Sequence, residues 1–244
     1  METPNFIYGA HAILEALNEC QPIDQILIKK QSDSEQIKEI IVQAKKQNVT
    51  IKSVPIEKLN KITRKAHQGV IAFMSPVEFH DVEQIVPSLF EKGEVPFLVL
   101  LDQVSDVRNF GAITRTCECM GVHAIVIPHH GSAQINADAV KTSAGALLKI
   151  PVCKTFSLKK TISYLQESGI EVICVAEKFS QNCYDADLTK PVALVFGSED
   201  TGIEQSIIDM ASTCIKIPMQ GEISSLNVSV AAAMCIYEVC RQRK

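Results

Sequence analysis

The chain has 244 residues, with 46% hydrophobic residues, 21% charged residues and a formal net charge of −4. This is the composition of a globular protein with one large or two small domains, and the net charge alone gives no sign of a nucleic-acid partner. No apolar run approaches the roughly 20 residues of a membrane span, and residues 1–10 lack the pattern of a secretory signal. We therefore expect a cytoplasmic protein with no membrane partner.

Nine cysteines are scattered along the chain without a CxxC pair. Cys117 and Cys119 are too close together for a usual metal pair, so the pattern favours structural thiols in a reducing cytosol over a zinc site. His129 and His130 follow a predicted strand, and we interpret them as part of a solvated loop. The sequence therefore predicts no metal.

Residues 1–75 have the pattern of a small α/β unit. Helices are predicted at Gly9–Glu19, from Ser34 through Ala44, and at Ile56–Thr63, and strands at Gln25–Lys30, Thr50–Val54 and Val70–Met74. The segment has a net charge of +2, and seven basic residues with one acid, Glu57, fall between Lys45 and Lys65. Such a run is typical of a solvated face, and it is also what an RNA-facing surface looks like.

Residues 76–95 are predicted to be a linker, because Pro76, Pro87 and Gly93 interrupt the pattern. A short helix is predicted within it at Val82–Phe90. The second domain then covers residues 96–244.

The second domain alternates between apolar strands and helices. Strands are predicted at Phe97–Leu101, Ala124–Ile127, Ile150–Lys154, Glu171–Val175, Val192–Phe196 and Cys214–Ile217, and helices at Asn109–Met120, Ala137–Ser143, Leu158–Glu167, Glu204–Met210 and Leu226–Arg241. This alternation indicates an α/β fold with a parallel sheet that is covered on both faces. Ligands of such sheets bind beyond the carboxyl ends of the strands.

The first of three polar turns runs from Leu101 to Arg115 and opens a helix. Asp106 or Asn109 could cap this helix, and Gly111 would allow close packing. We expect Arg115, on the second turn, to face the sheet. Because a buried arginine needs a partner, it invites an anionic or polar ligand.

The second turn, Phe196 to Gly202, resembles a phosphate loop only superficially. Ile203-Glu204 stands where a Walker A motif has Lys-Ser/Thr, so nucleoside triphosphate binding is not supported. The glycines would let the backbone approach a ligand, with Glu199 near the tip. The alternative is a plain turn with an exposed glutamate.

The third turn follows Ile217 and precedes the last helix. Ser224 or Ser225 is expected to cap that helix, and the first turn offers backbone N–H donors to a polar ligand. The helix is predicted to bury a face at helical spacing, formed by Leu226, Val230, Met234 and Tyr237. An ordinary cap on a core helix is the alternative interpretation of this stretch.

Together the three turns closely resemble the motifs of the SpoU (TrmH) family of RNA ribose 2′-O-methyltransferases. The matching segments are Asn109-x-Gly111-x-Ile113-x-Arg115-Thr116, Gly197-x-Glu199-x-x-Gly202, Ile217-Pro218-Met219 and Ser225-Leu226-Asn227-Val228-Ser229. Tyr8-Gly9-x-His11-Ala12 and His67-Gln68-Gly69-Val70 look like the N-terminal domain of the 23S rRNA guanosine 2′-O-methyltransferases. One departure is Val107-Arg108, where relatives often carry proline, and we expect it to affect loop stiffness.

The resemblance implies a SPOUT fold with a trefoil knot in the C-terminal domain and a ribosomal-protein-like N-terminal domain that presents RNA. It also implies a homodimer. The cofactor would be S-adenosylmethionine, bound in the knot against four residues: Gly197, Ile217, Met219 and Leu226.

The resemblance also implies catalytic roles for five polar residues. Arg115 matches the base proposed for the family, but a guanidinium stays protonated near neutral pH. We therefore expect Arg115 to hold an RNA phosphate and to stabilise negative charge on the 2′-oxygen. Glu199 would pair with an arginine of either subunit, and Asn109, Ser225 and Asn227 would position the ribose and the loops.

Three other functions compete with methylation of a 23S rRNA guanosine. The closest is methylation of a tRNA guanosine. A non-catalytic RNA-binding relative is disfavoured because the five polar residues occur together. A nucleotide-dependent oxidoreductase has only the α/β alternation in its favour, and the chain lacks the GxGxxG fingerprint.

Overall fold

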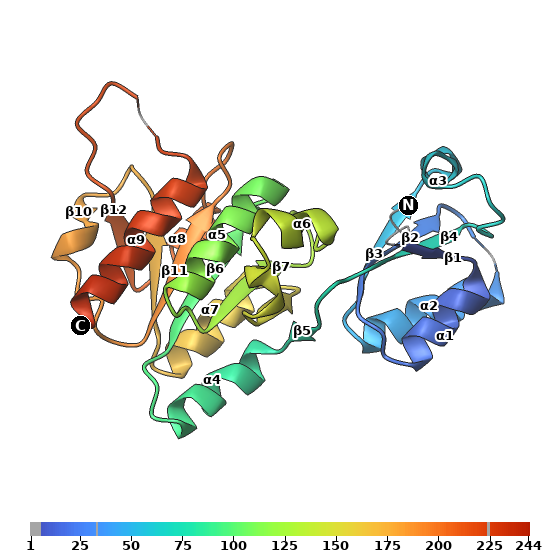
Figure 1. The fold of residues 1–244 in the computed structure, drawn as a ribbon, viewed down its shortest axis with the longest axis horizontal. Coiled ribbons are helices and arrows are strands. Elements are labelled where there is room, and N and C mark those ends of the chain that lie inside the picture. Colours follow the sequence, from blue (N-terminus) through green and yellow to red (C-terminus); the bar gives the residue numbers. More distant parts are fainter. Residues whose placement is uncertain (1–5, 33, 224) are drawn as a thin grey trace. The chain divides into compact units, whose positions relative to one another are not determined.

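The computed structural model of the chain describes residues 6–32, 34–223 and 225–244, which divide into two compact units (Figure 1). The first unit runs to Glu78 and also takes in Ile135–Ala137, and the second comprises Phe79–Gln134 and Asp138–Lys244. Each unit has its own sheet and core. Over the described ranges, no helix is both long enough and apolar enough to cross a membrane.

A mixed sheet of four strands, in the order β1-β4-β2-β3, forms the centre of the first unit. Successive strand residues point to opposite faces, so Ile26 and Ile28 of β2 pack with α1 and α2, whereas Leu27 packs with Leu59 of α3. The predicted helices and strands of this unit are confirmed, and only β1 is too short to show a period. The elements are β1 (Phe6–Tyr8), α1 (Ala10–Asn18), β2 (Ile23–Lys29), α2 (Glu35–Lys46), β3 (Thr50–Val54), α3 (Ile56–Ile62) and β4 (Val70–Met74).

Two loops of the first unit join at the start of α1. Gln68 Oε1 accepts a hydrogen bond from the backbone N–H of Ala10 at 3.0 Å, which satisfies a donor of the first helical turn. The buried His67 accepts from the N–H of Gly69 through Nδ1 at 3.1 Å, and its Nε2 lies 2.9 Å from Asn60 Oδ1. The two N-terminal sequence motifs therefore hold this loop and helix together.

The second unit is built on a sheet of eight strands in the order β10-β12-β9-β11-β6-β7-β8-β5 (Figure 1). Every neighbouring pair runs parallel, so the predicted parallel sheet is confirmed. The two-residue strands β5 and β10 are absent from the sequence prediction because they are too short to show a period. The strands are β5 (Phe79–His80), β6 (Phe97–Asp102), β7 (Ala124–Pro128), β8 (Val152–Thr155), β9 (Glu171–Val175), β10 (Gln181–Asn182), β11 (Val192–Gly197) and β12 (Thr213–Lys216).

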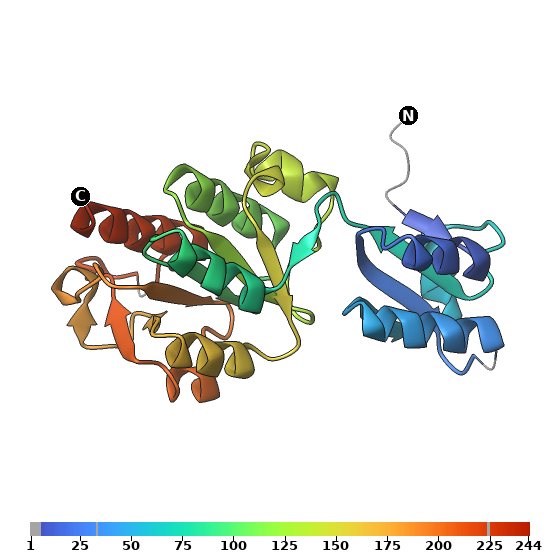
Figure 2. The same cartoon turned by 90° about the horizontal axis from the view of Figure 1, so that it is seen from below.

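Helices cover both faces of this sheet (Figure 2). α4, α7 and α8 share one apolar core with alternate residues of the strands. α5 and α9 pack side by side on the opposite face. The helical elements are α4 (Val82–Glu91), α5 (Val107–Cys119), α6 (Ala137–Thr142), η1 (Ala146–Leu148), α7 (Leu158–Glu167), η2 (Cys183–Asp185), α8 (Gln205–Ile208) and α9 (Val228–Gln242).

The stretch predicted as a linker is largely ordered within the second unit. β5 pairs with β8 at the edge of the sheet, and the buried Val82 and Val86 of α4 pack into the core of the same unit. Asp81 caps α4 by accepting from the N–H of Glu83 at 3.0 Å.

The outer side of α9 corrects one sequence prediction. The face predicted to be buried is between 39% and 56% exposed, and it comprises Leu226, Val230, Met234 and Tyr237. The side chains turned inward are instead Val228, Ala232, Cys235, Ile236 and Val239. Because α9 has apolar residues on two sides, helical spacing alone selects the wrong one. Leu226 lies ahead of the helix, and we call the other three, Val230, Met234 and Tyr237, the outer face of α9.

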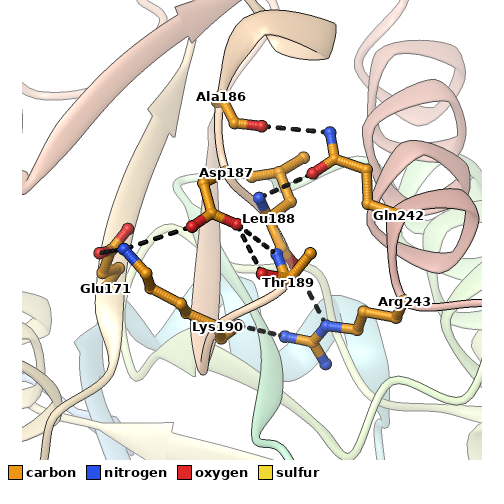
Figure 3. A network of polar contacts seen from close by, with 8 residues as sticks. All are labelled: Glu171, Ala186, Asp187, Leu188, Thr189, Lys190, Gln242 and Arg243. Atoms are coloured by element: carbon orange, nitrogen blue, oxygen red, sulfur yellow. Dashed lines mark hydrogen bonds and ion pairs between the residues drawn. The ribbon is translucent and has the colours of Figure 1, made fainter.

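A polar network fastens the carboxyl end of α9 (Figure 3). The guanidinium of Arg243 donates hydrogen bonds to four backbone carbonyls, those of Leu188, Val95, Pro96 and Lys190. Gln242 donates to the carbonyl of Ala186 at 3.1 Å and accepts from the N–H of Leu188 at 2.9 Å. We call this arrangement the carboxyl-end network. It fixes the helix whose other end carries the third motif.

Candidate active site

A cavity of about 670 Å³ opens beyond the carboxyl ends of β9 and β11. β11 lies next to β6, where the strand order reverses: the chain runs from β6 to β7 on one side and returns to β11 on the other. The cavity opens on the β9 side of β11, at the carboxyl edge where parallel sheets bind their ligands. The resemblance gives nine residues a catalytic or donor-binding role, and seven of them line the cavity, namely Gly197, Glu199, Ile217, Met219, Ser225, Leu226 and Asn227.

Gly197 ends β11 where the chain turns back sharply. A Cβ at this position would lie 2.1 Å from the carbonyl carbon of Gly202 and 2.3 Å from the nitrogen of Ile203. The turn closes through the N–H of Gly202, which donates to the carbonyl of Ser198 at 2.9 Å, and Gly202 has a φ of +67°. Both glycines are therefore required, one by the close backbone approach and the other by its left-handed conformation.

The buried Asp102 supports this turn from β6, where it pairs in register with Gly197. Its Oδ2 accepts a hydrogen bond from the N–H of Glu204 at 2.8 Å. Burial raises the pKa of Asp102, and the hydrogen bond from Glu204 opposes that shift. Sequence reasoning missed this role, although an aspartate at the end of an apolar strand was the available signal.

The three motifs meet at the side chain of Asn227. Its Nδ2 donates to Asn109 Oδ1 at 3.0 Å and to Glu199 Oε1. Its Oδ1 accepts from the N–H of Ser229 at 2.9 Å, which makes Asn227 the N-cap of α9. One amide thus joins α5, the loop after β11 and α9.

This geometry corrects the predicted cap of the last helix. α9 begins at Val228 and not at Leu226, so Ser225 lies ahead of the helix in the exposed loop that lines the cavity. Ser224, the other predicted cap, lies outside the described residues. At α5, Asp106 is the N-cap and accepts from the N–H groups of Arg108 and Asn109 at 2.8 and 2.9 Å.

Arg115 is exposed, so the prediction that it faces the sheet is wrong. The neighbouring Ile113, Thr114 and Cys117 are fully buried and take the inward side of α5. Within the described parts of the chain, the guanidinium of Arg115 makes no hydrogen bond or ion pair, and Glu199 bonds to Asn227 in place of an arginine.

Gly111 allows α5 to pack closely against α6. A Cβ there would lie 2.2 Å from Thr142 Oγ1. The close packing expected of Gly111 is therefore confirmed.

His129 and His130, after β7, were predicted to lie in a solvated loop, and this is correct for His130 only. His130 is exposed, but His129 is buried, with 5% of its surface exposed, and its ring stacks on that of Phe156. Burial, helped by Lys154 and His130, lowers the pKa of His129 to about 4, so its imidazole is neutral near pH 7. Among the described residues, no group of three or more His, Cys, Asp or Glu side chains is arranged to hold a metal ion.

Two family profiles match the chain. The profile of the SpoU rRNA Methylase family matches residues 96–237, and the profile for RNA 2′-O ribose methyltransferase substrate binding matches residues 6–80. Each of the two compact units is therefore matched by one of them.

Curated relatives match over nearly the whole chain. YacO of Bacillus subtilis (strain 168), assigned to the TrmH family of tRNA/rRNA methyltransferases, is 34% identical over 98% of this chain and 96% of its own length. A protein of Staphylococcus haemolyticus with the same assignment is 36% identical over 97% of this chain and 95% of its own.

Solved structures share the fold. The SpoU methyltransferase AviRb of Streptomyces viridochromogenes, in complex with AdoMet, has a TM-score of 0.62 at 22% identity and covers 98% of this chain and 90% of that one. The TrmH/SpoU tRNA-modifying enzyme of A. aeolicus has a TM-score of 0.56 at 32% identity and covers 66% of this chain and 83% of that one.

Proposed function

Because the chain belongs to the SpoU rRNA methylase family of RNA 2′-O-ribose methyltransferases, we propose that it methylates the ribose of a guanosine in 23S rRNA. The observation that carries the methyl-transfer chemistry is the junction at Asn227, which joins all three motifs beside one cavity. The alternative target is a tRNA guanosine.

The methyl donor of the family is S-adenosylmethionine, and the cavity suits it. Its volume of about 670 Å³ lies in the ordinary range for ligand pockets. Among its described lining residues, Glu177, Glu199 and Asp200 outnumber one cation, Lys178, a balance that favours a positively charged sulfonium. Gly197 lines the cavity at the point where the chain turns back on itself, so its backbone faces the ligand without a side chain.

We assign the donor to Gly197, Ile217, Met219 and Leu226, whose backbone and apolar surfaces line the cavity. We also propose the trefoil knot of the SPOUT fold. Its support is that β11, the segment after β12 and α9 converge on this one cavity.

The protein must place the ribose hydroxyl and manage its proton. When bound, S-adenosylmethionine supplies an electrophilic methyl group. Asn227, held by Asn109 and Glu199, would orient the ribose together with Ser225. Arg115 would bind the adjacent phosphate and stabilise negative charge on the 2′-oxygen, while the proton leaves to the phosphate or to solvent.

We propose a homodimer in which a second copy covers the outer face of α9. The support is a row of apolar side chains on α9, Val230, Met234 and Tyr237, that are between 46% and 56% exposed. Arg115 projects from the adjacent α5 and does not line the cavity of its own chain, which favours its use in the cavity of the partner.

An rRNA target is favoured by the first unit. Its match to a substrate-binding profile and its basic run from Lys45 to Lys65 suit a separate contact with folded RNA. A cytoplasmic location is also proposed. All nine cysteines are free thiols, as a reducing compartment requires.

The test is transfer of radiolabelled methyl from S-adenosylmethionine to unmodified transcripts of 23S rRNA fragments and of tRNA. We expect alkali-stable label at one guanosine linkage of the rRNA, lost in Arg115→Ala while donor binding survives. Label on tRNA alone would overturn the rRNA target, and full activity of Arg115→Ala would overturn its role.

Mixed dimers test which chain supplies Arg115. Arg115→Ala and Glu199→Gln are each expected to be inactive alone. If the arginine serves the partner's cavity, random hybrids of the two should regain about a quarter of the wild-type sites, because about half of the dimers then hold one intact site. No recovery would show that each chain uses its own arginine.

A further inference from the structure

We propose that Phe156 is a stacking platform for an unpaired base of the RNA substrate, next to the nucleotide that is methylated. Phe156 follows β8 at the carboxyl edge of the sheet, and 63% of its surface is exposed. A single exposed phenylalanine needs no explanation by itself. Four features distinguish Phe156: the ring that stacks on it, the hydrogen bonds that hold its turn, its place on the sheet edge and the nearby cations.

The ring of Phe156 stacks on the ring of His129. The two ring centroids are 3.9 Å apart and the planes differ by 19°, which is a stacked arrangement. Because His129 is buried and neutral, it fixes one face of Phe156 without placing a charge there. The exposed remainder of the phenylalanine ring faces solvent, as a base-stacking surface must.

The turn that carries Phe156 is held on both sides. Thr155 Oγ1 accepts from the N–H of Ser157 at 3.1 Å and from Thr161 Oγ1 at 3.0 Å. The N–H of His129 donates to the carbonyl of Thr155 at 2.9 Å. An aromatic ring that is already ordered loses little freedom when a ligand binds, so more of the stacking free energy appears as affinity.

The position suits a nucleotide beside the target ribose. β8 is two strands from β6 and three from β11, which places the platform roughly 10–15 Å along the same edge from the motif junction. The loop after β7 also touches the loop after β6, since the N–H of Ala133 donates to the carbonyl of Val104 at 3.0 Å. Phe156 and the junction at Asn227 therefore lie on one continuous edge of the sheet.

Cations flank the platform in the sequence. Lys154 precedes it and lies 4.0 Å from the ring centroid of Phe79, and the exposed Lys159 and Lys160 follow it. Lys159 is 3.2 Å from Glu204 Oε1, which leaves Lys160 as the more available charge for a phosphate. An aromatic ring among cations is the arrangement that binds single-stranded nucleic acid.

Fluorescence tests the platform directly, because the chain contains no tryptophan. In Phe156→Trp, single-stranded oligouridine and oligoadenosine should quench the emission as they bind, and an RNA duplex of equal length should bind with little quenching. Phe90→Trp, at another exposed phenylalanine on α4, is the matched control and should show no quenching with either RNA. Equal quenching of Phe156→Trp by the duplex, or bound RNA without quenching, would overturn the proposal.

The second test is steady-state kinetics on an unmodified transcript that the wild type methylates. Phe156→Leu keeps apolar volume but removes the π-surface, so KM for RNA should rise on the order of tenfold with kcat and donor binding nearly unchanged. Phe156→Tyr should restore KM, and Phe90→Leu should leave it unchanged. An unaltered KM in Phe156→Leu would overturn the platform.

This inference rests on RNA being the substrate, and the two failures are distinguishable. If the wild type methylates no transcript, the proposed function fails. If it methylates RNA and Phe156→Leu does so equally well, only the platform fails. A change of oligomeric state in Phe156→Leu, seen by sedimentation, would assign the ring to contact with a second copy and overturn the proposal.

Discussion

The two ends of α9 are held in different ways. At the amino end, Asn227 bonds to side chains of two other elements, and of these three residues Asn227 and Glu199 are exposed and Asn109 is half-buried. At the carboxyl end, Gln242 and Arg243 bond mainly to backbone groups that are partly buried. Side-chain contacts in water are readily exchanged for a ligand, whereas contacts to buried backbone are costly to break. The carboxyl end of α9 is therefore firmly anchored, whereas the polar contacts at its amino end can be exchanged for contacts with a ligand.

The largest expected effect is at the amino end. Asn227→Ala removes the donor shared by Asn109 and Glu199, and we expect kcat/KM for methyl transfer to fall about 100- to 1,000-fold. Loss of the cap should lower the free energy of unfolding by only about 1 kcal/mol. Methyl-transfer kinetics and thermal unfolding measure the two effects.

The matched variant is Asn227→Asp, which keeps the capping oxygen and removes the N–H donor. It also sets a carboxylate against Glu199, but because both groups are exposed this repulsion should lower the free energy of unfolding by less than about 1 kcal/mol, while turnover is lost. Wild-type turnover in Asn227→Asp would show that the junction at Asn227 is only structural.

The next largest effect is expected on dimer formation through the outer face of α9. Met234→Glu places a carboxylate in the middle of the outer face, which is 46% exposed at that residue. If a second copy covers this face, the dissociation constant of the dimer should rise on the order of 100-fold, because an unpaired charge is costly to bury. Sedimentation equilibrium measures it.

Val42→Glu is the control for the outer face. Val42 is 54% exposed on α2 of the first unit, and the same change there should leave association unaltered. Equal sedimentation of Met234→Glu and the wild type would argue against a dimer through α9.

At the carboxyl end the effect should appear in stability. Arg243→Ala leaves four backbone carbonyls without their donor, and we expect the free energy of unfolding to fall by about 2–3 kcal/mol. Activity per folded molecule should persist. Denaturant unfolding measures this change, with the exposed Lys244→Ala as a control that should have no effect. An unchanged stability would mean that the carboxyl-end network does not anchor α9.

The smallest effect is a pH dependence beside the same network. Arg241 bonds to the carboxylate of Glu238 at 2.7 and 2.8 Å and holds the pKa of Glu238 below its usual value of 4.5. A lowered carboxyl pKa stabilises the fold above the unfolded value, and this gain is lost as the pH falls through the folded value. We expect less than about 1 kcal/mol, because Arg241 is largely solvated.

The measurement compares the wild type with Glu238→Gln. The difference in free energy of unfolding between the two should shrink as the pH is lowered from neutral to below about 4. A difference that stays constant over this range would exclude the ion pair as its source.

Local patterns were sufficient for the sheet and for the motifs. The strands of the second unit are uniformly apolar and the intervening helices amphipathic, so a parallel sheet followed from alternation alone. Gly197 and Gly202 were also singled out from the sequence, as glycines that let the backbone approach a ligand, and the structure adds that one has no room for a Cβ and the other a left-handed φ.

The choice between two possible faces was made only by the tertiary structure. Arg115 and the outer face of α9 turned outward and His129 turned inward, each against its prediction. The meeting of Asn109, Glu199 and Asn227 joins residues far apart in the chain, so no local spacing encodes it. Sequence determines which residues can lie on a face, but a helix with two apolar sides turns toward the sheet the side that packs best, and that depends on all its neighbours at once.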